Sequence, residues 1–165
     1  MLVSMGFRRM AIASALLLAV ATPARADITA FIGANTTPQN RAARGFALGI
    51  SFLIVGIEFE YSNTSDNTEP TALAPSLKTG TGNVLLQTPG AIGGFQPYFT
   101  TGAGLYNESL GDHSDTSFVL NTGGGVKVNL VGPLRVRVDY RVFKLGSGAL
   151  YSPAHRIYAG LNLKF

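Results

Sequence analysis

Hydrophobic and polar residues alternate one by one along several stretches of the chain. In residues 134–142, LRVRVDYRV, the even positions are leucine, valine or tyrosine and the odd positions are arginine or aspartate. Residues 45–52 and 55–61 alternate in the same way, and the second stretch carries Glu58 and Glu60 on its polar side. A period of two residues is typical of β-strands with one apolar and one polar face. Helical periodicity is almost absent after residue 26, so we expect an all-β fold.

The alternation predicts about eight strands, each bounded by turn-forming or polar residues. Their expected positions are residues 29–34, 45–52, 55–61, 77–87, 95–106, 117–130, 134–142 and 156–165. Most approach the length of about 9–11 residues that a tilted strand needs to cross a bilayer. The first strand is ambiguous in phase and the fourth is mixed.

The predicted connections alternate between long and short. We expect polar loops at 35–44, 62–76, 107–116 and 145–153, and tighter turns at 53–54, 88–94 and 131–133. An up-and-down meander whose hairpins are long on one side and short on the other is the layout of outer-membrane barrels, with long loops outside and short turns in the periplasm.

Two kinds of barrel fit this layout, and they differ in the face that turns inward. A soluble, lipocalin-like barrel encloses its apolar face, whereas a membrane barrel turns that face to lipid and keeps its charges in the lumen. Aromatic residues near the strand ends favour the membrane barrel, because aromatic girdles lie at both membrane interfaces. These residues are Phe46, Phe52, Phe59, Tyr61, Phe99, Tyr140 and Phe165. The polar faces also carry glycines, such as Gly125, that leave room in a narrow lumen. The predicted fold class is an all-β, eight-stranded antiparallel up-and-down transmembrane β-barrel.

The first 26 residues have the features of a secretory signal peptide. An arginine pair at 8–9 precedes an apolar segment at 11–21 that is too short to span a bilayer as a helix, and ARA at 24–26 has the form of a cleavage site. We expect cleavage after residue 26 and a barrel domain at 27–165. The alternative is a membrane-anchoring or core helix.

Composition narrows the classes of partner. The formal net charge is +4, but three of the 13 basic residues and none of the nine acidic ones lie in the first 26 residues, so the remaining domain is nearly neutral. We therefore expect no nucleic-acid partner. Cysteine is absent, which excludes disulfides, a thiol nucleophile and cysteine-ligated metal. We expect neither a metal site nor a cofactor.

The charged positions of the strands form a mixed-sign set that we expect to point into the lumen. The set comprises Glu58, Glu60, Lys127, Arg135, Arg137, Asp139, Arg141 and Arg156, with Lys164 nearby. Charges in so narrow a space must be paired or hydrated. We interpret them as a salt-bridge plug that fills the pore, with a narrow ion pore as the alternative.

The two histidines allow an enzyme to be considered, because some small outer-membrane barrels modify lipid A. Such an enzyme needs a nucleophilic serine, a histidine base and an acidic residue that orients the base. His113 lies beside Ser114 and Asp115 in a predicted loop, where we expect solvated polar side chains. His155 lies at the outer end of the last strand and lacks the His-x-Ser pattern of the deacylases. We therefore expect no enzymatic activity.

Three stretches carry a resemblance to a known family. GFQPYFTTGAGLYN at 94–107, NTGGGVKVNLVGPLRVRVDYRVF at 121–143 and the ending RIYAGLNLKF resemble the last four strands of the OmpA/OmpX-like outer-membrane β-barrel domain family. The resemblance implies a bacterial outer-membrane location and insertion by the barrel-assembly machinery, after contact with periplasmic chaperones. In that family the machinery recognises a last strand with a terminal aromatic residue. The resemblance thus implies an assembly signal at Tyr158, Leu161, Leu163 and Phe165.

The sequence as a whole predicts a non-enzymatic integral outer-membrane protein that supports envelope integrity or displays loops at the cell surface. Its expected partner is outer-membrane lipid, including lipopolysaccharide, and we expect a monomer. The main alternative is an adhesion or receptor-binding module acting through the loop at 62–76, which carries Asp66 and Glu69. A narrow ion pore and a lipid A-modifying enzyme are further alternatives.

Overall fold

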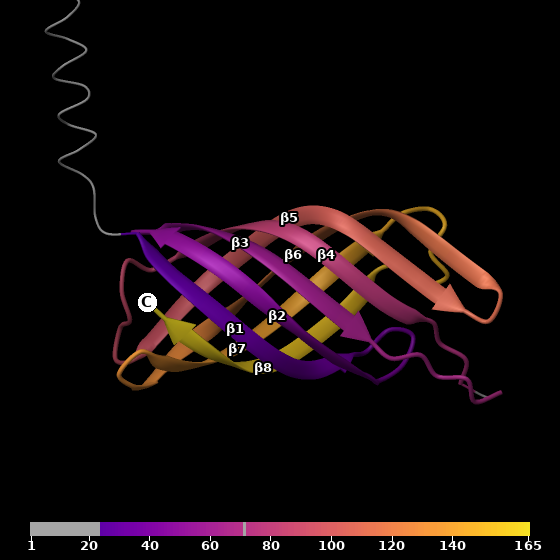
Figure 1. The fold of residues 1–165 in the computed structure, drawn as a ribbon, viewed down its shortest axis with the longest axis horizontal. Helices are drawn as coiled ribbons and strands as arrows, with labels where there is room; N and C mark the ends of the chain where they lie inside the picture. Colours follow the sequence, from indigo (N-terminus) through magenta and orange to yellow (C-terminus); the bar gives the residue numbers. More distant parts are fainter. Residues whose placement is uncertain (1–23, 71) are drawn as a thin grey trace, which may run out of the picture.

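The computed structural model describes residues 24–70 and 72–165, which form a closed barrel of eight antiparallel strands. Each strand pairs with the next along the chain, and the last pairs with the first (Figure 1). The strands are β1 (Arg25–Asn35), β2 (Arg41–Phe52), β3 (Val55–Thr64), β4 (Ser76–Gln87), β5 (Phe95–Leu110), β6 (His113–Val131), β7 (Leu134–Leu145) and β8 (Ala154–Lys164). The predicted up-and-down barrel is confirmed.

Most of the predicted signal peptide, residues 1–23, lies outside the described residues. β1 begins at Arg25, so its first two residues belong to the segment that we expect to be removed. Ala26 pairs with Ile50 and accepts a backbone hydrogen bond from Phe165 at 2.8 Å. Cleavage after Ala26 stays a prediction. Across the two described ranges, no helix is long and apolar enough to cross a membrane.

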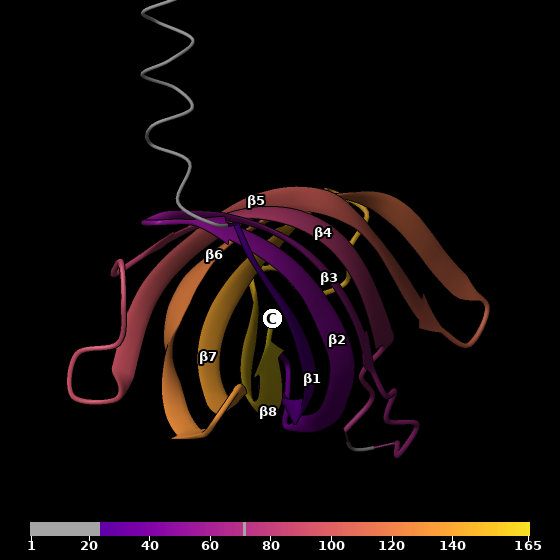
Figure 2. The ribbon, with the colours of Figure 1, turned by 60° about the vertical axis from the view of Figure 1, so that its left-hand side comes forward.

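The two ends of the barrel differ in their connections. At one end, called the inner end here, lie the start of β1, the end of β8 and the turns at 53–54, 88–94 and 132–133. The opposite, outer end carries the loops 36–40 and 146–153, the β3–β4 loop, and the β5–β6 hairpin, which projects beyond the other strands in Figures 1 and 2. The layout predicts that the inner end faces the periplasm.

The predicted loop at 107–116 is wrong, because β5 and β6 continue as paired strands through most of it. Their ladder extends to Leu110 and His113, which leaves only a two-residue turn in which Gly111 has a φ of 57°. Asn107 donates a side-chain hydrogen bond to Thr116 across this extension at 2.9 Å. Polar residues therefore continue the sheet beyond the apolar band, where alternation of hydrophobicity gives no signal.

Side chains alternate between the barrel interior and the outer surface. Ile32 and Phe118 are 74% and 76% exposed on the outside, whereas Arg137 and Arg141 are fully buried inside. All seven predicted girdle aromatics lie on the outer surface. An outer surface of this kind matches lipid tails, which are as apolar as these side chains. The arrangement excludes the lipocalin-like barrel, whose charges would face water.

Strand pairing fixes the tilt of the strands. One row of paired residues starts at Pro97 of β5 and passes through Val126, Val138, Ala159, Ile32, Arg44, Asn63 and Lys78 before it returns to β5 at Asn107. The row closes ten residues further along β5, which gives a shear of ten for eight strands. A shear of this size corresponds to a tilt of about 40°. Each row therefore climbs toward the outer end as it passes around the barrel.

Candidate functional site

Four charged side chains of β3 and β7 meet in the middle of the barrel. Glu58 of β3 accepts hydrogen bonds from Arg137 and Arg141 of β7, with Nη2–Oε1 distances of 3.1 and 2.8 Å. Asp139 accepts from the same two arginines at 3.1 and 3.0 Å. Each of these residues is at most 1% exposed. Because β3 and β7 lie on opposite sides of the ring, the ion pairs with Glu58 cross the lumen.

Tyr98 of β5 completes this central cluster. Its hydroxyl donates a hydrogen bond to Asp139 and accepts one from Nε of Arg137 at 2.7 Å. The Arg137 guanidinium also lies 4.8 Å from the centre of the Tyr98 ring, within range of a cation–π interaction. Gly125 permits this packing, because a Cβ atom there would lie 2.5 Å from the Tyr98 hydroxyl oxygen and 2.1 Å from the Val138 carbonyl oxygen.

A second cluster lies nearer the outer end, around Arg156 of β8. The guanidinium donates hydrogen bonds to Glu60 and to the Ser62 hydroxyl of β3. It also stacks on Phe143, with 4.4 Å from Cζ to the ring centre. Glu60 accepts a further hydrogen bond from Tyr158 at 3.2 Å. An ion pair of 3.3 Å between Glu60 and Arg141 joins this cluster to the central one.

The third cluster lies toward the inner end and is centred on Asp27 of β1, which the sequence did not assign to the lumen. Asp27 pairs with Lys127 at 2.7 Å and with Arg135 at 3.1 Å. Arg135 also donates to Gln96 at 3.0 Å and to Asn162 at 2.7 Å. The period-two spacing of Asp27, Thr29 and Phe31 indicates one face, but the apolar Phe31 on that face and the small Ala30 on the other leave the phase of this strand ambiguous.

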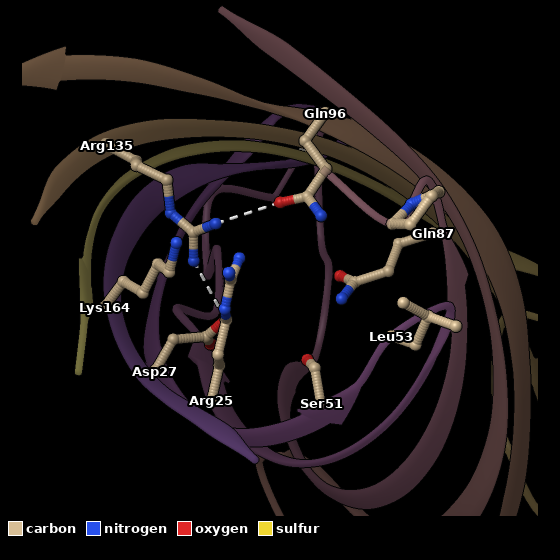
Figure 3. A pocket seen from close by; sticks show the side chains of 9 residues that line it. Arg25, Asp27, Ser51, Leu53, Gln87, Gln96, Arg135 and Lys164 are labelled. Atoms are coloured by element: carbon tan, nitrogen blue, oxygen red, sulfur yellow. Dashed lines mark hydrogen bonds and ion pairs between the residues drawn. The ribbon is translucent and has the colours of Figure 1, made fainter. Parts of the chain in front are cut away.

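A small cavity of about 140 Å³ lies beside this cluster at the inner end of the barrel. In Figure 3, Arg135 approaches Gln96 and Asp27, and Lys164 and Arg25 are drawn beside them. The other lining residues are Ser51, Leu53, Gln87 and Pro89. Arg25 belongs to the segment that we expect to be removed, but Arg135 and Lys164 remain against one carboxylate and give the cavity a positive character.

An apolar layer inside the outer end was not predicted. It consists of Leu77, Tyr106, Val119, Phe143, Leu145 and Ala154, all at most 6% exposed. Phe143 links this layer to the charges, because it packs against the Arg156 guanidinium. The mixed phase of the fourth predicted strand was the available signal, since Leu77 and Leu85 turn inward there.

The structure places all eight predicted lumen residues in the interior, where none is more than 6% exposed. It divides them among the three clusters. Arg135 pairs with Asp27, which lies outside the predicted set. Arg156, in turn, pairs with Glu60. These pairings depend on which residues face each other across a tilted barrel, and no single strand contains that information.

Neither histidine belongs to a serine–histidine–acid arrangement in the described part of the chain. His155 faces outward, and its Nδ1 lies 2.6 Å from the Tyr140 hydroxyl. His113 is exposed at the start of β6, and the Asp115 carboxylate accepts a hydrogen bond from Tyr106. Residues 24–70 and 72–165 also contain no group of three or more histidine, aspartate or glutamate side chains placed to hold a metal ion.

The four predicted assembly-signal residues lie on both faces of the barrel. Tyr158 is buried in the lumen, where its ring stacks on Phe31 with 4.0 Å between ring centres. Leu161, Leu163 and Phe165 face outward near the inner end. An assembly factor could contact the three outward side chains on the folded barrel, but Tyr158 only before the barrel closes.

Comparisons with known proteins place this geometry among bacterial outer-membrane barrels. No protein-family model matches the chain, and no curated protein matches it. The N-terminal β-barrel domain of Pseudomonas aeruginosa OprF superposes with a TM-score of 0.62 and 17% identity, covering 86% of this chain and 97% of that one. Neisserial surface protein A gives 0.62 and 15%, covering 86% and 96%. The outer membrane enzyme PagL gives 0.52 and 15%, covering 83% and 98%.

Identities this low establish the fold alone. The closed ring, the charged interior and the apolar outer surface define a small eight-stranded outer-membrane β-barrel of the bacterial type, similar in fold to the OmpA/OmpX-like barrels. Because the same fold includes an enzyme, activity must be argued from the residues of this chain.

Proposed function

We propose that this protein is a non-enzymatic outer-membrane protein that contributes to the integrity of the envelope and displays its outer loops without conducting solutes. The observation that supports this proposal most strongly is the filled interior. Side chains from opposite strands meet across the lumen, as in the contact between Glu58 and Arg141 at 2.8 Å.

Ion pairing keeps the interior closed. The three clusters contain four anionic and five cationic side chains, and each cation has an anionic partner within 3.3 Å. An ion crossing the barrel would have to separate such pairs, and a buried charge without a partner costs several kcal/mol. The apolar layer at the outer end adds a second barrier, because five of its six side chains have no polar group to replace the hydration shell of an ion and the Tyr106 hydroxyl donates its hydrogen bond to Asp115.

We expect the refolded protein to show no stepwise conductance in planar lipid bilayers. As a matched comparison, the double variant Glu58→Ala, Arg141→Ala removes one charge of each sign and shortens two side chains that close the lumen, so it should conduct more than the unmodified protein. Stable, solute-sized channels from the unmodified protein would contradict the proposal and favour the pore.

The β3–β4 loop supports display at the surface as a second function. It is held by a two-residue bridge between Asn67 and Ala74 and by a hydrogen bond from Gln39 to the Ala72 carbonyl. Asp66 and Glu69 are exposed on it. A loop with fixed contacts and exposed carboxylates is suited to a basic partner surface.

If this loop is an adhesion surface, replacing residues 66–73 with a glycine–serine linker should abolish attachment of cells to immobilised host-cell proteins while leaving the barrel folded on unboiled gels. The matched control is a replacement of the loop at 147–151. Equal attachment by both variants and by the unmodified protein would count against the adhesion module.

A further inference from the structure

The charged side chains that point outward from the strands are all cationic, and all lie toward the outer end of the barrel. Arg44 of β2, Lys78 of β4 and Lys144 of β7 are exposed on the outer surface. The acidic residues in the described strands all have inward phase, so no carboxylate points outward from a strand. All three cations lie in the outer part of their strands, and the outward positions near the inner end are apolar, as at Phe52 and Phe165.

Two of these cations belong to one row of paired residues. Arg44 pairs with Asn63, Asn63 with Lys78, and Lys78 with Asn107. Two strand spacings separate Arg44 from Lys78, so their Cα atoms are about 10 Å apart. With a strand tilt of about 40°, Lys78 lies about 6 Å closer to the outer end. Within the described residues neither cation forms an ion pair, and Asn63 between them is half-buried.

The surface beside Arg44 is hollowed. Two grooves of about 760 and 880 Å³ adjoin each other over β1, β2 and β8, and both are lined by Ile32, Arg44 and Asn63. Their floor is formed by small residues, including Ala30, Ala34, Ala42 and Ala159. The aromatic pair Phe46 and Tyr61, with ring centres 5.9 Å apart, lines the groove nearer the inner end. An extended hydrocarbon chain fits such a groove, with its head beside Arg44.

We propose that Arg44, Asn63 and Lys78 form a binding site for the phosphate groups of lipopolysaccharide in the outer leaflet, with an acyl chain of the same lipid in the adjoining groove. Arginine binds phosphate through paired N–H donors and lysine binds it as a point charge. Asn63 supplies an amide between the two cations for a sugar hydroxyl or a phosphate oxygen.

The charges, rather than the groove, must give this site its specificity. Lipid tails are as apolar as alanine and isoleucine side chains, so filling the groove from the bilayer provides packing but no hydrophobic driving force. A second copy of the chain is a poorer occupant of the surface, because its own outer strand surface offers no carboxylate to Arg44 and Lys78. The inner leaflet is excluded by position, since these outward cations are confined to the outer half of the barrel.

Lys144 provides a matched control. It is outward-facing and exposed like Lys78, and it lies three strands away from both β2 and β4 in the ring. A general attraction of the barrel for anionic lipid would depend on all three cations alike. A localised site would depend on Arg44 and Lys78 but not on Lys144.

The test measures lipid binding to the refolded full chain in detergent micelles by native mass spectrometry, with diphosphoryl lipid A, its dephosphorylated form and phosphatidylglycerol as probes. We expect the unmodified protein to prefer diphosphoryl lipid A. The double variant Arg44→Gln, Lys78→Gln should lose about tenfold or more in affinity, as expected for two charge-assisted contacts, and Lys144→Gln should lose less than about twofold.

Equal losses in the two variants, no loss in the double variant, or equal affinity of the unmodified protein for phosphatidylglycerol would each overturn the site. So would dimers that form in place of lipid complexes. The inference rests on the proposed function, because it requires a barrel inserted in the outer membrane. The two fail separately: a barrel that runs folded on unboiled gels but does not distinguish the lipids refutes only this site, whereas failure of the unmodified protein to insert into bilayers refutes the proposed function.

Discussion

Replacing both Glu58 and Glu60 with glutamine is expected to lower the free energy of unfolding by about 3–5 kcal/mol, the range for breaking buried ion pairs by removal of one partner. Glu58 is the shared acceptor of Arg137 and Arg141, and Glu60 is the carboxylate paired with Arg156. Glutamine keeps the shape of each side chain but leaves these cations short of compensating charge. The measurement is the fraction of folded protein on unboiled gels across a urea series in lipid vesicles.

The same variant should remain closed to ions, because the glutamines still fill the lumen. Glu69→Gln is the matched control, since this exposed loop residue undergoes the same chemical change and should shift stability by no more than about 0.5 kcal/mol. A double variant as stable as the unmodified protein would show that the lumen is hydrated enough to solvate the arginines. The three clusters would then not hold the barrel together.

The existence of most strands, and the face of each that turns inward, could be predicted because the polar faces of some strands carry full charges rather than neutral polar residues. Arg135, Arg137, Asp139 and Arg141 alternate with apolar residues on β7, and such a pattern fits only a strand with two different environments. In β1 and β4 the signal was weaker. Alanines face outward on β1, and Leu77 and Leu85 face inward on β4, so hydrophobicity does not distinguish their faces.

The contacts across the lumen could not be predicted from the sequence, for a geometric reason. Asp27 meets Arg135 at 3.1 Å although 107 residues lie between them in the chain. Which side chains meet depends on the shear of the closed ring, and shear is a property of all eight pairings together. A list of lumen charges could therefore be drawn from alternation, whereas the division into three clusters could not.

The outward orientation of the cations could not be predicted from the sequence either. Arg44 lies one position before the predicted start of its strand, and Lys78 lies in the strand with mixed phase, so neither had an assigned face. Strand pairing places them in one row with Asn63 between them. Their importance also depends on the contrast between the outer and inner ends of the surface, which becomes visible only when the strands are aligned by height.

Phe165 is expected to matter far more for assembly in cells than for stability after refolding. Its side chain is 65% exposed on the outer surface, and its backbone N–H donates to the Ala26 carbonyl at 2.8 Å. Phe165→Ala removes only the ring, whose burial in lipid is worth about 1–3 kcal/mol. An eight-stranded barrel should withstand this loss, whereas recognition of the strand by the assembly machinery can fail completely.

Phe52→Ala is the matched control, because Phe52 is 54% exposed and lines the same outer hollow as Phe165 at the inner end. Both variants should lower the unfolding midpoint of refolded protein by similar amounts, since each removes one ring from the same interface. Only Phe165→Ala should also deplete the protein from the outer membrane and leave it exposed to periplasmic proteases. Normal outer-membrane levels of Phe165→Ala, measured against Phe52→Ala in the same cells, would reduce Phe165 to lipid-facing packing and remove the assembly signal from β8.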